Sequence, residues 1–398
     1  MADNGSTPKA KQWRPATMLV RGGQTRSEWG ETSEGLYLTS GYVYPSAERH
    51  QARMAGEEPG YIYSRYANPT VRMFEERLAM LEGAEDCRAT SSGMAAVNTM
   101  LAGACKPGDR IVAPRALFSS NIWILKNVMP KMGVAVDWVN GADLDDWKRA
   151  LSKPVRFVLI ETPSNPMLDA VDIAEVAKLT HAAGGELIVD NVFASPVLQK
   201  PLQLGADWVV YSATKHMDGQ GRVLGGAVLG KTKAIEDHIQ QYYRHTGPSM
   251  SPFNAWVLVK GLETLDVRVS RMAQNAALIA DRLAQHPAVS QVRYPGRKDH
   301  PHHAVHAKQM AGGGTLIAFE LKGGREDAFA MLNKLELIDI SNNLGDSKSL
   351  ITHPATTTHR SLTDQERAEA GLTDKWIRLS VGLEDAEDLA SDLEQALS

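Results

Sequence analysis

Lys215 lies in a sequence setting that differs from that of an ordinary surface lysine. The stretch "YSATKHMDGQGR" at positions 211–222 places it directly after Ser212, Ala213 and Thr214 and before a glycine-rich segment. The apolar run "DWVVY" comes just before, so we expect Lys215 immediately beyond a buried strand. An amine that is shielded from water loses its proton more readily and can bond covalently to a carbonyl compound. Lys215 is therefore a candidate nucleophile, although a lone lysine in a loop does not establish one.

Asp190 is a second candidate, because it ends the apolar run "ELIVD". We expect its carboxylate at the carboxyl edge of a sheet, where open α/β sheets bind their ligands. A carboxylate there can cap a helix, bind a metal ion or hold the protonated ring nitrogen of a cofactor. If its strand neighbours the one that leads to Lys215, both side chains face the same crevice.

Two further segments offer hydrogen-bond donors for an anion. Ser92 and Gly93 in "TSSGMAAVNTMLAG" precede an alanine-rich helix, whose first N–H groups and dipole attract phosphate. Tyr63 and Arg65 in "YIYSRYANPT" are also strong phosphate donors. Each segment has an ordinary interpretation as well, as a helix cap or as an interface tyrosine beside a salt bridge. The sequence contains no GxxxxGK[ST] motif, which argues against a nucleotide site of that type.

The composition is that of a globular protein. Hydrophobic residues make up 43% of the 398 residues, and the formal net charge of −4 argues against nucleic acid as the main partner. No apolar stretch approaches the roughly 20 residues of a membrane span. The N-terminal "MADNGSTPKAKQWRPAT" lacks the apolar core of a secretion signal. With two cysteines, Cys87 and Cys105, we expect a cytoplasmic protein without a disulfide framework or membrane contact.

A group of histidines in "HPHHAVHAKQM" raises the question of a metal site. His302 and His306 are spaced to share one face of a helix, with His300 and His303 close by. Acidic and cysteine ligands are not evident near them, and Pro301 breaks the regularity. We therefore expect the solvated start of a helix and no metal.

Short apolar runs alternate with helical patterns, which predicts a mostly parallel sheet covered on both faces. "TVRMFEERLAMLEG" has Val71, Phe74, Leu78 and Leu81 on one helical face, and Gly83 is a natural end. "DIAEVAKLTHAAGG" predicts a second amphipathic helix. The runs expected as strands are "DRIVAP", "VAVDWVN", "RFVLIETP", "ELIVDN", "DWVVYSATK" and "GGAVLG".

The chain divides into three expected parts. Residues 1–65 are a flexible tail and an extended arm that packs on a neighbouring subunit, 66–255 form the large domain, and 256–398 form a smaller C-terminal domain. A long helix, interrupted near Gly261 and ended by Pro287, joins the two domains. Strands are expected at "GTLIAFEL" and "KWIRLSVG", a capping box at "TDQE", and a last helix at "EDAEDLASDLEQAL".

In their order along the chain these motifs resemble one enzyme family. The matching segments are "YSRYANPT", "TSSGMAA", "ETPSNP", "VDNVFASPVLQKPLQLGAD", "YSATKHMDG", "LGDSKSLITHPATTTH" and "IRLSVGLED". They are similar to the Cys/Met-metabolism family of pyridoxal-phosphate-dependent enzymes, from about residue 18 to the C-terminus. The resemblance implies the type I, aminotransferase-like α/β fold, with a mostly parallel central sheet and a smaller α/β C-terminal domain.

The resemblance also implies a role for each candidate residue. Lys215 would bind pyridoxal 5′-phosphate as a Schiff base and later transfer protons, and Asp190 would hold the pyridinium nitrogen. Arg378 would bind the α-carboxylate of the substrate, aided by Asn165 and Asn343. Asn165 would also contact the cofactor. The residues expected around the cofactor's phosphate and ring are Ser92, Gly93, Met94, Ser212, Thr214 and the stacking Phe118, with Tyr63 and Arg65 of a second subunit. This sharing requires an oligomer, and the resemblance implies a homotetramer built from active-site-sharing dimers.

Departures from the common pattern indicate a branch of the family. Phe118 lacks the phenol that lyases and synthases use, and Trp123 stands where several members have an arginine. Asn342 and Asn343 replace an acidic residue and a serine of many lyases. "ISNNLGDSKSLITHPATTTH" is most similar to the homoserine-ester sulfhydrylases, especially the O-succinylhomoserine type. His216 follows the lysine where an aromatic residue is more usual, and the sequence gives no reason for it.

The expected activity is therefore γ-replacement on an O-acylated homoserine. O-succinylhomoserine and sulfide would give homocysteine and succinate, as a step of methionine biosynthesis. The first alternative is cystathionine γ-synthase or γ-lyase activity on the same scaffold. A pyridoxal-phosphate-binding regulator without catalysis and a nucleotide-binding module remain alternatives from other classes.

Overall fold

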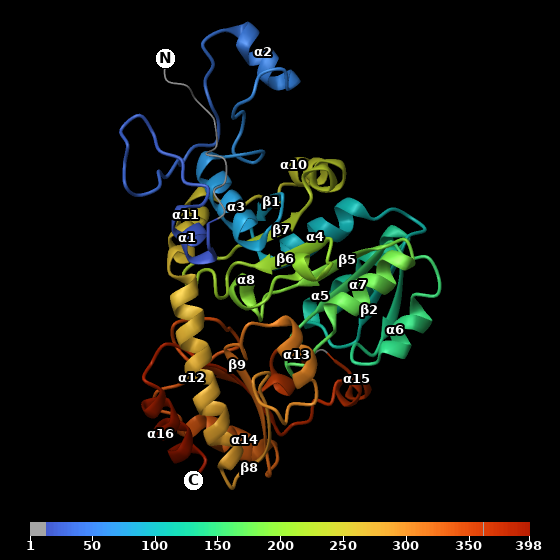
Figure 1. Cartoon of the computed structure of the whole chain (residues 1–398), viewed down its shortest axis with the longest axis vertical. Coiled ribbons are helices and arrows are strands. Elements are labelled where there is room, and N and C mark those ends of the chain that lie inside the picture. Colours follow the sequence, from blue (N-terminus) through green and yellow to red (C-terminus); the bar gives the residue numbers. More distant parts are fainter. Residues whose placement is uncertain (1–12, 361) are drawn as a thin grey trace.

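The computed structural model describes residues 13–360 and 362–398, which form two β-sheets with helices packed around them. In Figure 1 the larger sheet lies in the middle of the molecule and the smaller sheet lies below it. Helix α12 (Leu265–Gln285) runs down one side from the first region to the second. Within the described residues, no helix is long and apolar enough to cross a membrane.

The larger sheet has seven strands in the order β1-β7-β6-β5-β4-β2-β3. Its strands are β1 (Asp86–Thr90), β2 (Arg110–Pro114), β3 (Ala135–Val139), β4 (Phe157–Glu161), β5 (Glu186–Asp190), β6 (Trp208–Ser212) and β7 (Gly226–Gly230). Strands β2 to β6 pair in parallel, and β7 pairs antiparallel with both β1 and β6. The predicted mostly parallel α/β sheet is confirmed, and each predicted strand of this part is present.

Helices cover both faces of this sheet, as its fully apolar strands require. Successive residues of β6 show this, because Val209 and Val210 are both buried but belong to different hydrophobic clusters. The helices of this part are α3 (Pro69–Glu82), α4 (Gly93–Ala104), α5 (Ser119–Asn127), α6 (Leu144–Ala150), α7 (Ile173–Ala182), α8 (Ser195–Leu198), α9 (Thr232–Ala234), α10 (Gln241–Thr246) and α11 (Pro252–Glu263).

Local sequence signals account for the ends of α3. The side chain of Asn68 accepts a hydrogen bond from the Thr70 N–H at 2.9 Å, and Pro69 occupies the first helical turn, where its missing N–H costs nothing. Gly83 ends the helix in the left-handed conformation at φ +84°. The apolar face predicted for this segment is buried in the core that α3 shares with α1 (Pro15–Arg21) and α11.

The smaller sheet has five strands in the order β10-β11-β12-β9-β8. Its strands are β8 (Val289–Arg293), β9 (Leu316–Leu321), β10 (Asp339–Ile340), β11 (Leu350–Thr352) and β12 (Trp376–Ser380). Its helices are α13 (His303–Gln309), α14 (Arg325–Lys334), α15 (Asp364–Glu369) and α16 (Ala386–Ala396). The predicted capping box precedes α15: Thr363 accepts from the Glu366 N–H, and Glu366 accepts from the Thr363 N–H.

The long helix predicted between the domains is two helices, α11 and α12, which separate at Thr264. Gly261 lies inside α11, and a Cβ at this glycine would come within 2.3 Å of the Met217 carbonyl oxygen. Gly261 therefore permits close packing against the segment that follows Lys215. The division into 1–65, 66–255 and 256–398 stays a prediction, and its second boundary falls within α11.

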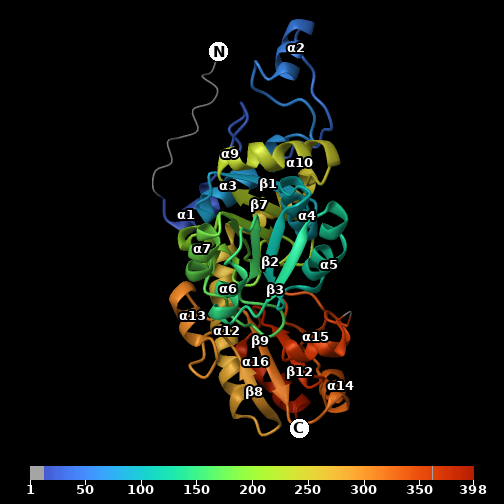
Figure 2. The same ribbon diagram turned by 90° about the vertical axis from the view of Figure 1, so that its right-hand side faces the viewer.

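The N-terminal region is partly folded on its own chain. Residues 1–12 of the predicted tail lie outside the described residues, but α1 begins at Pro15 and buries Leu19 against α3 and α11. Farther along, α2 (Ala47–Ala55) and its flanking segments extend away from the body, as Figures 1 and 2 show. The side chains of Val43 and Leu38 are 93% and 67% exposed there. Such an apolar extension is typical of an arm that packs on another chain.

Candidate active site

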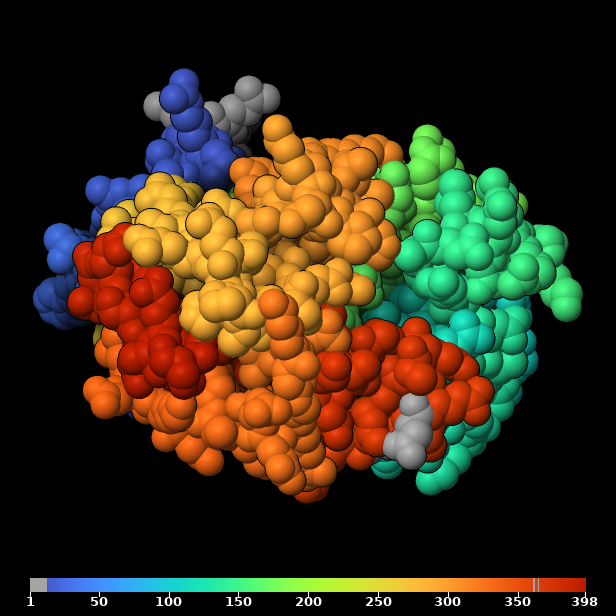
Figure 3. Space-filling view, turned by 90° about the horizontal axis from the view of Figure 1, so that it is seen from below, coloured from blue at the N-terminus to red at the C-terminus, as the bar shows by residue number. Residues whose placement is uncertain are grey.

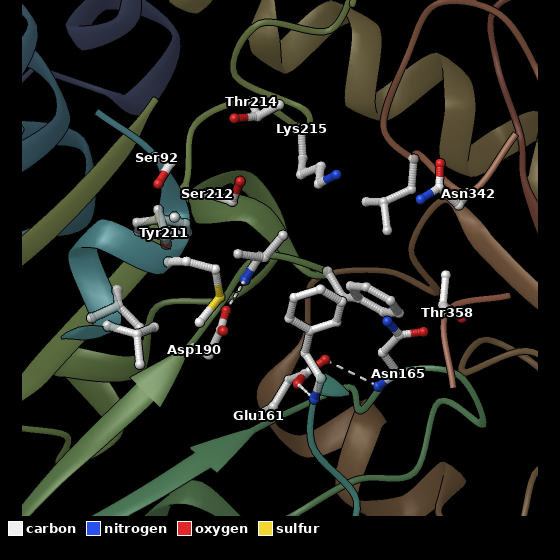
Figure 4. A pocket seen from close by; sticks show the side chains of 18 of the residues that line it. Ser92, Glu161, Asn165, Asp190, Tyr211, Ser212, Thr214, Lys215, Asn342 and Thr358 are labelled. Atoms are coloured by element: carbon white, nitrogen blue, oxygen red, sulfur yellow. Dashed lines mark hydrogen bonds between the residues drawn. The ribbon is translucent and has the colours of Figure 1, made fainter. Parts of the chain in front are cut away.

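A cavity of about 250 Å³ lies at the carboxyl ends of β4, β5 and β6. Figure 4 shows side chains converging on it from the larger sheet and from loops of the smaller one. Its lining residues are Ser92, Gly93, Met94, Val97, Phe118, Glu161, Asn165, Asp190, Val192, Phe193, Val210, Tyr211, Ser212, Thr214, Lys215, Leu224, Asn342, Leu344, Thr358 and Arg378. The cavity thus brings together most of the residues that the sequence singled out.

Lys215 projects into this cavity from the turn that follows β6. Its ammonium group donates a hydrogen bond to the side-chain oxygen of Asn343, which belongs to a loop of the smaller sheet. Burial, together with the positive charge of Arg378, lowers the pKa of Lys215 from 10.5 to about 8. A substantial fraction of this amine is therefore neutral near physiological pH, which a nucleophilic amine requires.

Asp190 reaches the same cavity from the end of β5. One carboxylate oxygen accepts a hydrogen bond from the Asn121 side chain at 3.1 Å, and the other accepts from the Val192 N–H at 3.2 Å. Burial raises the pKa of Asp190 from 3.8 to about 6. A cationic group placed against it would stabilise the carboxylate and be stabilised in turn.

The N-terminus of α4 and the end of β6 form a close-packed cradle. Ser92 caps α4 by accepting from the Ala95 N–H at 3.1 Å. A Cβ at Gly93 would lie 2.6 Å from the Cβ of Ser212, and a Cβ at Gly226 would lie 2.1 Å from the Ser92 carbonyl oxygen. Both positions therefore need glycine. The first N–H groups of this twelve-residue helix, with Ser212 and Thr214 beside it, are suited to an anion.

Arg378 lies in β12 and enters the cavity from the smaller sheet. Its Nη1 donates to the Asn165 side-chain oxygen at 2.9 Å, and its Nη2 donates to the carbonyl oxygens of Asn342 and Asn343 at 2.9 and 3.2 Å. Its Nε is buried and has no hydrogen-bond partner among the described residues. Burial lowers the pKa of Arg378 to about 10. A guanidinium held by neutral oxygens is ready to receive a carboxylate.

These groups match the cofactor that the sequence resemblance implied. The amine of Lys215 suits its aldehyde, the carboxylate of Asp190 suits its ring nitrogen, and the α4 cradle suits its phosphate. The cavity places these three groups around one space, with Phe118 in its wall. Met94, Asn165 and Thr214 also line it, as the resemblance implied.

Three residues that the sequence singled out lie elsewhere. Tyr63 and Arg65 line a separate surface hollow with residues of the arm, and Arg65 donates to the Arg244 carbonyl oxygen. Trp123 on α5 is 59% exposed and is not among the lining residues of the cavity. One chain therefore does not bring Tyr63 and Arg65 to Lys215.

Glu161 is a residue that sequence reasoning missed. It ends β4, is only 3% exposed, and accepts hydrogen bonds from the backbone N–H groups of Phe118 and Asn165. Burial and the nearby charge of Asp190 raise its pKa well above the usual range. The signal was present, since Glu161 ends an apolar strand in the same way as Asp190.

His216 now has a structural explanation. Its side chain is buried, and its Nε2 lies 2.8 Å from the Thr315 hydroxyl. A Cβ at Gly345 would lie 2.7 Å from the His216 backbone nitrogen, so the loop that carries Asn343 approaches this residue closely. His216 thus helps to join the segment after Lys215 to the smaller sheet.

The histidine group is not a solvated helix start, and that expectation was wrong. His300 and His306 are buried at 3% and 1% exposure, with ring centroids 4.9 Å apart. The Nε2 of His306 lies 2.9 Å from the Leu168 carbonyl oxygen, and His302 accepts from the Ala170 N–H at 3.1 Å. His302 and His306 therefore stabilise the loop at 162–171, which carries Asn165. No group of three or more possible metal ligands is found in residues 13–360 and 362–398.

Comparison with known proteins gives relatives along the whole chain. O-succinylhomoserine sulfhydrylase of Mycobacterium tuberculosis strain H37Rv is 53% identical, and the alignment covers 100% of both chains. The protein of the same name from Pseudomonas aeruginosa PAO1 is 44% identical over 96% of this chain and 94% of its own. L-methionine gamma-lyase of Fusobacterium nucleatum subsp. polymorphum is 40% identical over 98% of this chain and 99% of its own.

The fold comparison agrees with the sequence comparison. The crystal structure of cystathionine gamma synthase from Xanthomonas oryzae pv. oryzae in complex with cystathionine superposes with a TM-score of 0.92 and 37% identity. This match covers 97% of this chain and 98% of that one. The model of the Cys/Met metabolism PLP-dependent enzymes matches residues 16–398. The chain therefore belongs to the Cys/Met metabolism family of pyridoxal-phosphate-dependent enzymes.

Proposed function

We propose that this protein catalyses γ-replacement on O-succinylhomoserine, with sulfide as the incoming nucleophile and homocysteine and succinate as products. The observation that carries the proposal is the meeting of Lys215, Asp190 and Arg378 around one cavity. This arrangement supplies an amine of lowered pKa, a carboxylate for a ring nitrogen and a guanidinium for an amino-acid carboxylate. Together these groups suit an amino acid as substrate and pyridoxal phosphate as cofactor.

Lys215 is proposed to carry both the cofactor linkage and the protons. Pyridoxal phosphate, when bound, supplies an electron sink for the carbon next to the amino group of the substrate. The lowered pKa of Lys215 lets its amine accept a proton from that carbon and return one later. Asn343 accepts a hydrogen bond from this ammonium group and would hold it beside the reacting carbons.

Asp190 and Arg378 are proposed to fix the cofactor and the substrate. Asp190 would keep the ring nitrogen protonated, since Asn121 and Val192 orient its carboxylate. Arg378 would bind the α-carboxylate through its Nη groups and its unpartnered Nε, with Asn165 beside it. Ser92, Gly93, Met94, Ser212 and Thr214 would surround the phosphate, and Phe118 would stack on the ring.

The preference for the succinyl ester and for sulfide rests on the relatives. The proteins named O-succinylhomoserine sulfhydrylase are 53% and 44% identical to this chain, and the gamma-lyase is 40% identical. The alternative is cystathionine γ-synthase or γ-lyase activity, which the likeness to the Xanthomonas enzyme keeps open.

The proposed reaction is tested by supplying O-succinylhomoserine with sulfide and, separately, with cysteine, and identifying the products by mass spectrometry. Homocysteine and succinate in strong preference to cystathionine support the proposal. A preference for cystathionine, or 2-oxobutyrate with ammonia, assigns the protein to the alternative. Repeating the assay with O-acetylhomoserine decides which acyl group the cavity prefers.

We also propose that a second subunit contributes residues to the active site, and that the enzyme is cytoplasmic. Tyr63 and Arg65 lie on the exposed arm and away from Lys215 of their own chain. We propose that they bind the cofactor phosphate in a neighbouring chain, within a homotetramer of site-sharing dimers. The exposed apolar side chains of the arm support this role.

A further inference from the structure

Glu161 is buried in the wall of the cavity, and none of the roles proposed for Lys215, Asp190 and Arg378 uses it directly. Its two carboxylate oxygens serve two different segments. Oε2 accepts from the Phe118 N–H just before α5, and Oε1 accepts from the Asn165 N–H at 3.0 Å in the loop after β4. Figure 4 shows the hydrogen bond between Glu161 and Asn165 as a dashed line. One carboxylate thus fixes the backbone of both Phe118 and Asn165.

Those two residues bound the cavity in different ways. Phe118 lies where a ring would stack on the cofactor, and Asn165 accepts from the guanidinium of Arg378 at 2.9 Å. The position of Glu161 therefore affects both the cofactor ring and the carboxylate-binding group. A substitution of Glu161 should therefore disturb both the position of the Phe118 ring and the hydrogen bond between Asn165 and Arg378.

Glu161 also affects Arg378, through Asn165. Arg378 is fully buried, and its guanidinium donates hydrogen bonds to the neutral oxygens of Asn165, Asn342 and Asn343. The Asn165 N–H donates to Glu161, and the Asn165 side-chain oxygen accepts from Arg378, so Glu161 helps to hold the oxygen that orients this guanidinium.

We infer that Glu161 is a positioning residue, which aligns the stacking ring and the carboxylate-binding arginine through Phe118 and Asn165. This inference rests on the proposed assignment of the site and goes beyond it, because Glu161 itself need not touch cofactor or substrate. The two strand-end carboxylates then have distinct roles. Asp190 faces the ring nitrogen, and Glu161 fixes the backbone of Phe118 and Asn165.

The decisive variant is Glu161→Gln, which keeps the size of the side chain. A glutamine offers one oxygen and one NH₂ group, so one of the two backbone N–H groups would face a donor instead of an acceptor. We expect a changed circular dichroism of the bound cofactor and a KM for the amino acid raised roughly tenfold or more. Glu161→Asp keeps two oxygens on a shorter side chain and should show an intermediate effect.

The matched control is Glu75→Gln. Glu75 is also buried and also accepts a backbone hydrogen bond, from the Ala89 N–H at 2.8 Å, but it does not line the cavity. Its variant should lower the melting temperature and leave the cofactor dichroism and KM as in the unchanged protein. If Glu161→Gln does not fold, Glu161→Asp is compared with the control in the same measurements.

Two results would overturn the inference. One is an unchanged cofactor dichroism and KM in the folded Glu161 variant; the other is an equal change of both in Glu75→Gln. The dichroism needs no substrate, so it decides the role of Glu161 even if O-succinylhomoserine is not converted. A failure of the proposed reaction would appear separately, in the products of the unchanged protein.

Discussion

Glu161 and Asp190 lie opposite each other on the neighbouring parallel strands β4 and β5, and each is the last residue of its strand. Burial raises the pKa of both carboxyls, and the charge of Asp190 raises that of Glu161 further. Their hydrogen-bond partners differ. Glu161 accepts from two backbone N–H groups, whereas Asp190 accepts from the Asn121 side chain and one backbone N–H. Two neighbouring carboxylates in different surroundings can serve different purposes.

The amine of Lys215 should react at a lower pH than other lysines of the protein. Burial and the charge of Arg378 lower its pKa from the ordinary 10.5 to about 8, so its neutral form appears at a correspondingly lower pH. The cofactor-free protein is treated with an acylating reagent at a series of pH values, and labelling is followed by peptide mass spectrometry. The rate at Lys215 should rise with a midpoint near 8. Lys178, whose pKa is raised by Glu175, serves as the control, and identical profiles would contradict the prediction.

Replacement of Arg378 by lysine should weaken substrate binding more than turnover. A lysine cannot supply donors in the fixed fork of a guanidinium, and Asn165 and the two backbone carbonyls would lose their partner. We expect KM to rise about 10- to 100-fold, which corresponds to roughly 1.4 to 2.7 kcal/mol, with a smaller fall in kcat. Steady-state kinetics of Arg378→Lys and of the surface variant Arg282→Lys provide the comparison. A KM equal in both variants would exclude the proposed carboxylate contact.

Two inactive variants should restore activity in a mixed oligomer. Lys215→Ala removes the amine of its own site, and Arg65→Ala removes a donor that we assign to the neighbouring site. In a mixed dimer, one site combines Lys215 of one chain with Arg65 of the other and is intact. Random pairing of equal amounts gives about a quarter of all sites intact.

The measurement is the specific activity of the co-expressed variants relative to each expressed alone. The control mixture pairs Lys215→Ala with Asp190→Asn, whose changes both affect the site of their own chain, so no intact site forms. Activity of the first mixture at the level of its inactive parents would show that Arg65 does not act across subunits.

Acidification below about pH 6.5 should destabilise the protein partly through its buried histidines. Burial lowers the pKa of His306 and His216 to about 4, so the unfolded chain binds protons at these positions that the folded chain does not. Their contribution to stability is therefore complete above pH 6.5 and is lost as the pH falls toward 4. Each such histidine contributes up to about 1.4 kcal/mol per pH unit in that range.

His306→Gln isolates one of these contributions. Glutamine can still donate to the Leu168 carbonyl oxygen but does not titrate, so the unfolding free energy should fall less steeply between pH 6.5 and 4. Denaturant unfolding at several pH values measures the slope. The same change at the exposed His245 is the control, and a slope in His306→Gln equal to that of the unchanged protein would refute the assignment.

The apolar strands and the residues at their ends were predictable from the sequence because the pattern is strong there. A run such as 186–190 is buried throughout, and its last residue, Asp190, must emerge at the sheet edge. Strand β1 was not predicted, since "DCRAT" has a polar composition and is a strand through its pairing with β7. The short β10 and β11 likewise depend on pairing partners distant in the sequence.

Among the site residues, too, some follow from local sequence patterns and others depend on contacts in the folded chain. Lys215, Asp190 and Arg378 follow from strand ends and motifs, and the structure places all three around one cavity. The strand-end position of Glu161 could be read from the sequence, but its two backbone contacts, from Phe118 and Asn165, exist only in the folded chain. The burial of His300 and His306 also depends on packing against the loop at 162–171, which their spacing along the chain cannot reveal.

The segment around α15 extends from the smaller sheet to the larger one. Lys126 on α5 pairs with Glu366, and Arg115 pairs with Glu369. In Figure 3 the orange-red C-terminal segment lies against the teal segment that contains α5. Both pairs are partly exposed, so each contributes at most about 1 kcal/mol and is weakened by salt.

Lys215 and Arg378 belong to different sheets, and this has a consequence for the physical behaviour of the whole molecule. A bound amino acid that contacts both residues would link the part of the protein around the larger sheet to the part around the smaller sheet. Heat or denaturant would then have to displace this ligand before the two parts could separate. A saturating ligand should therefore raise the melting temperature of the protein.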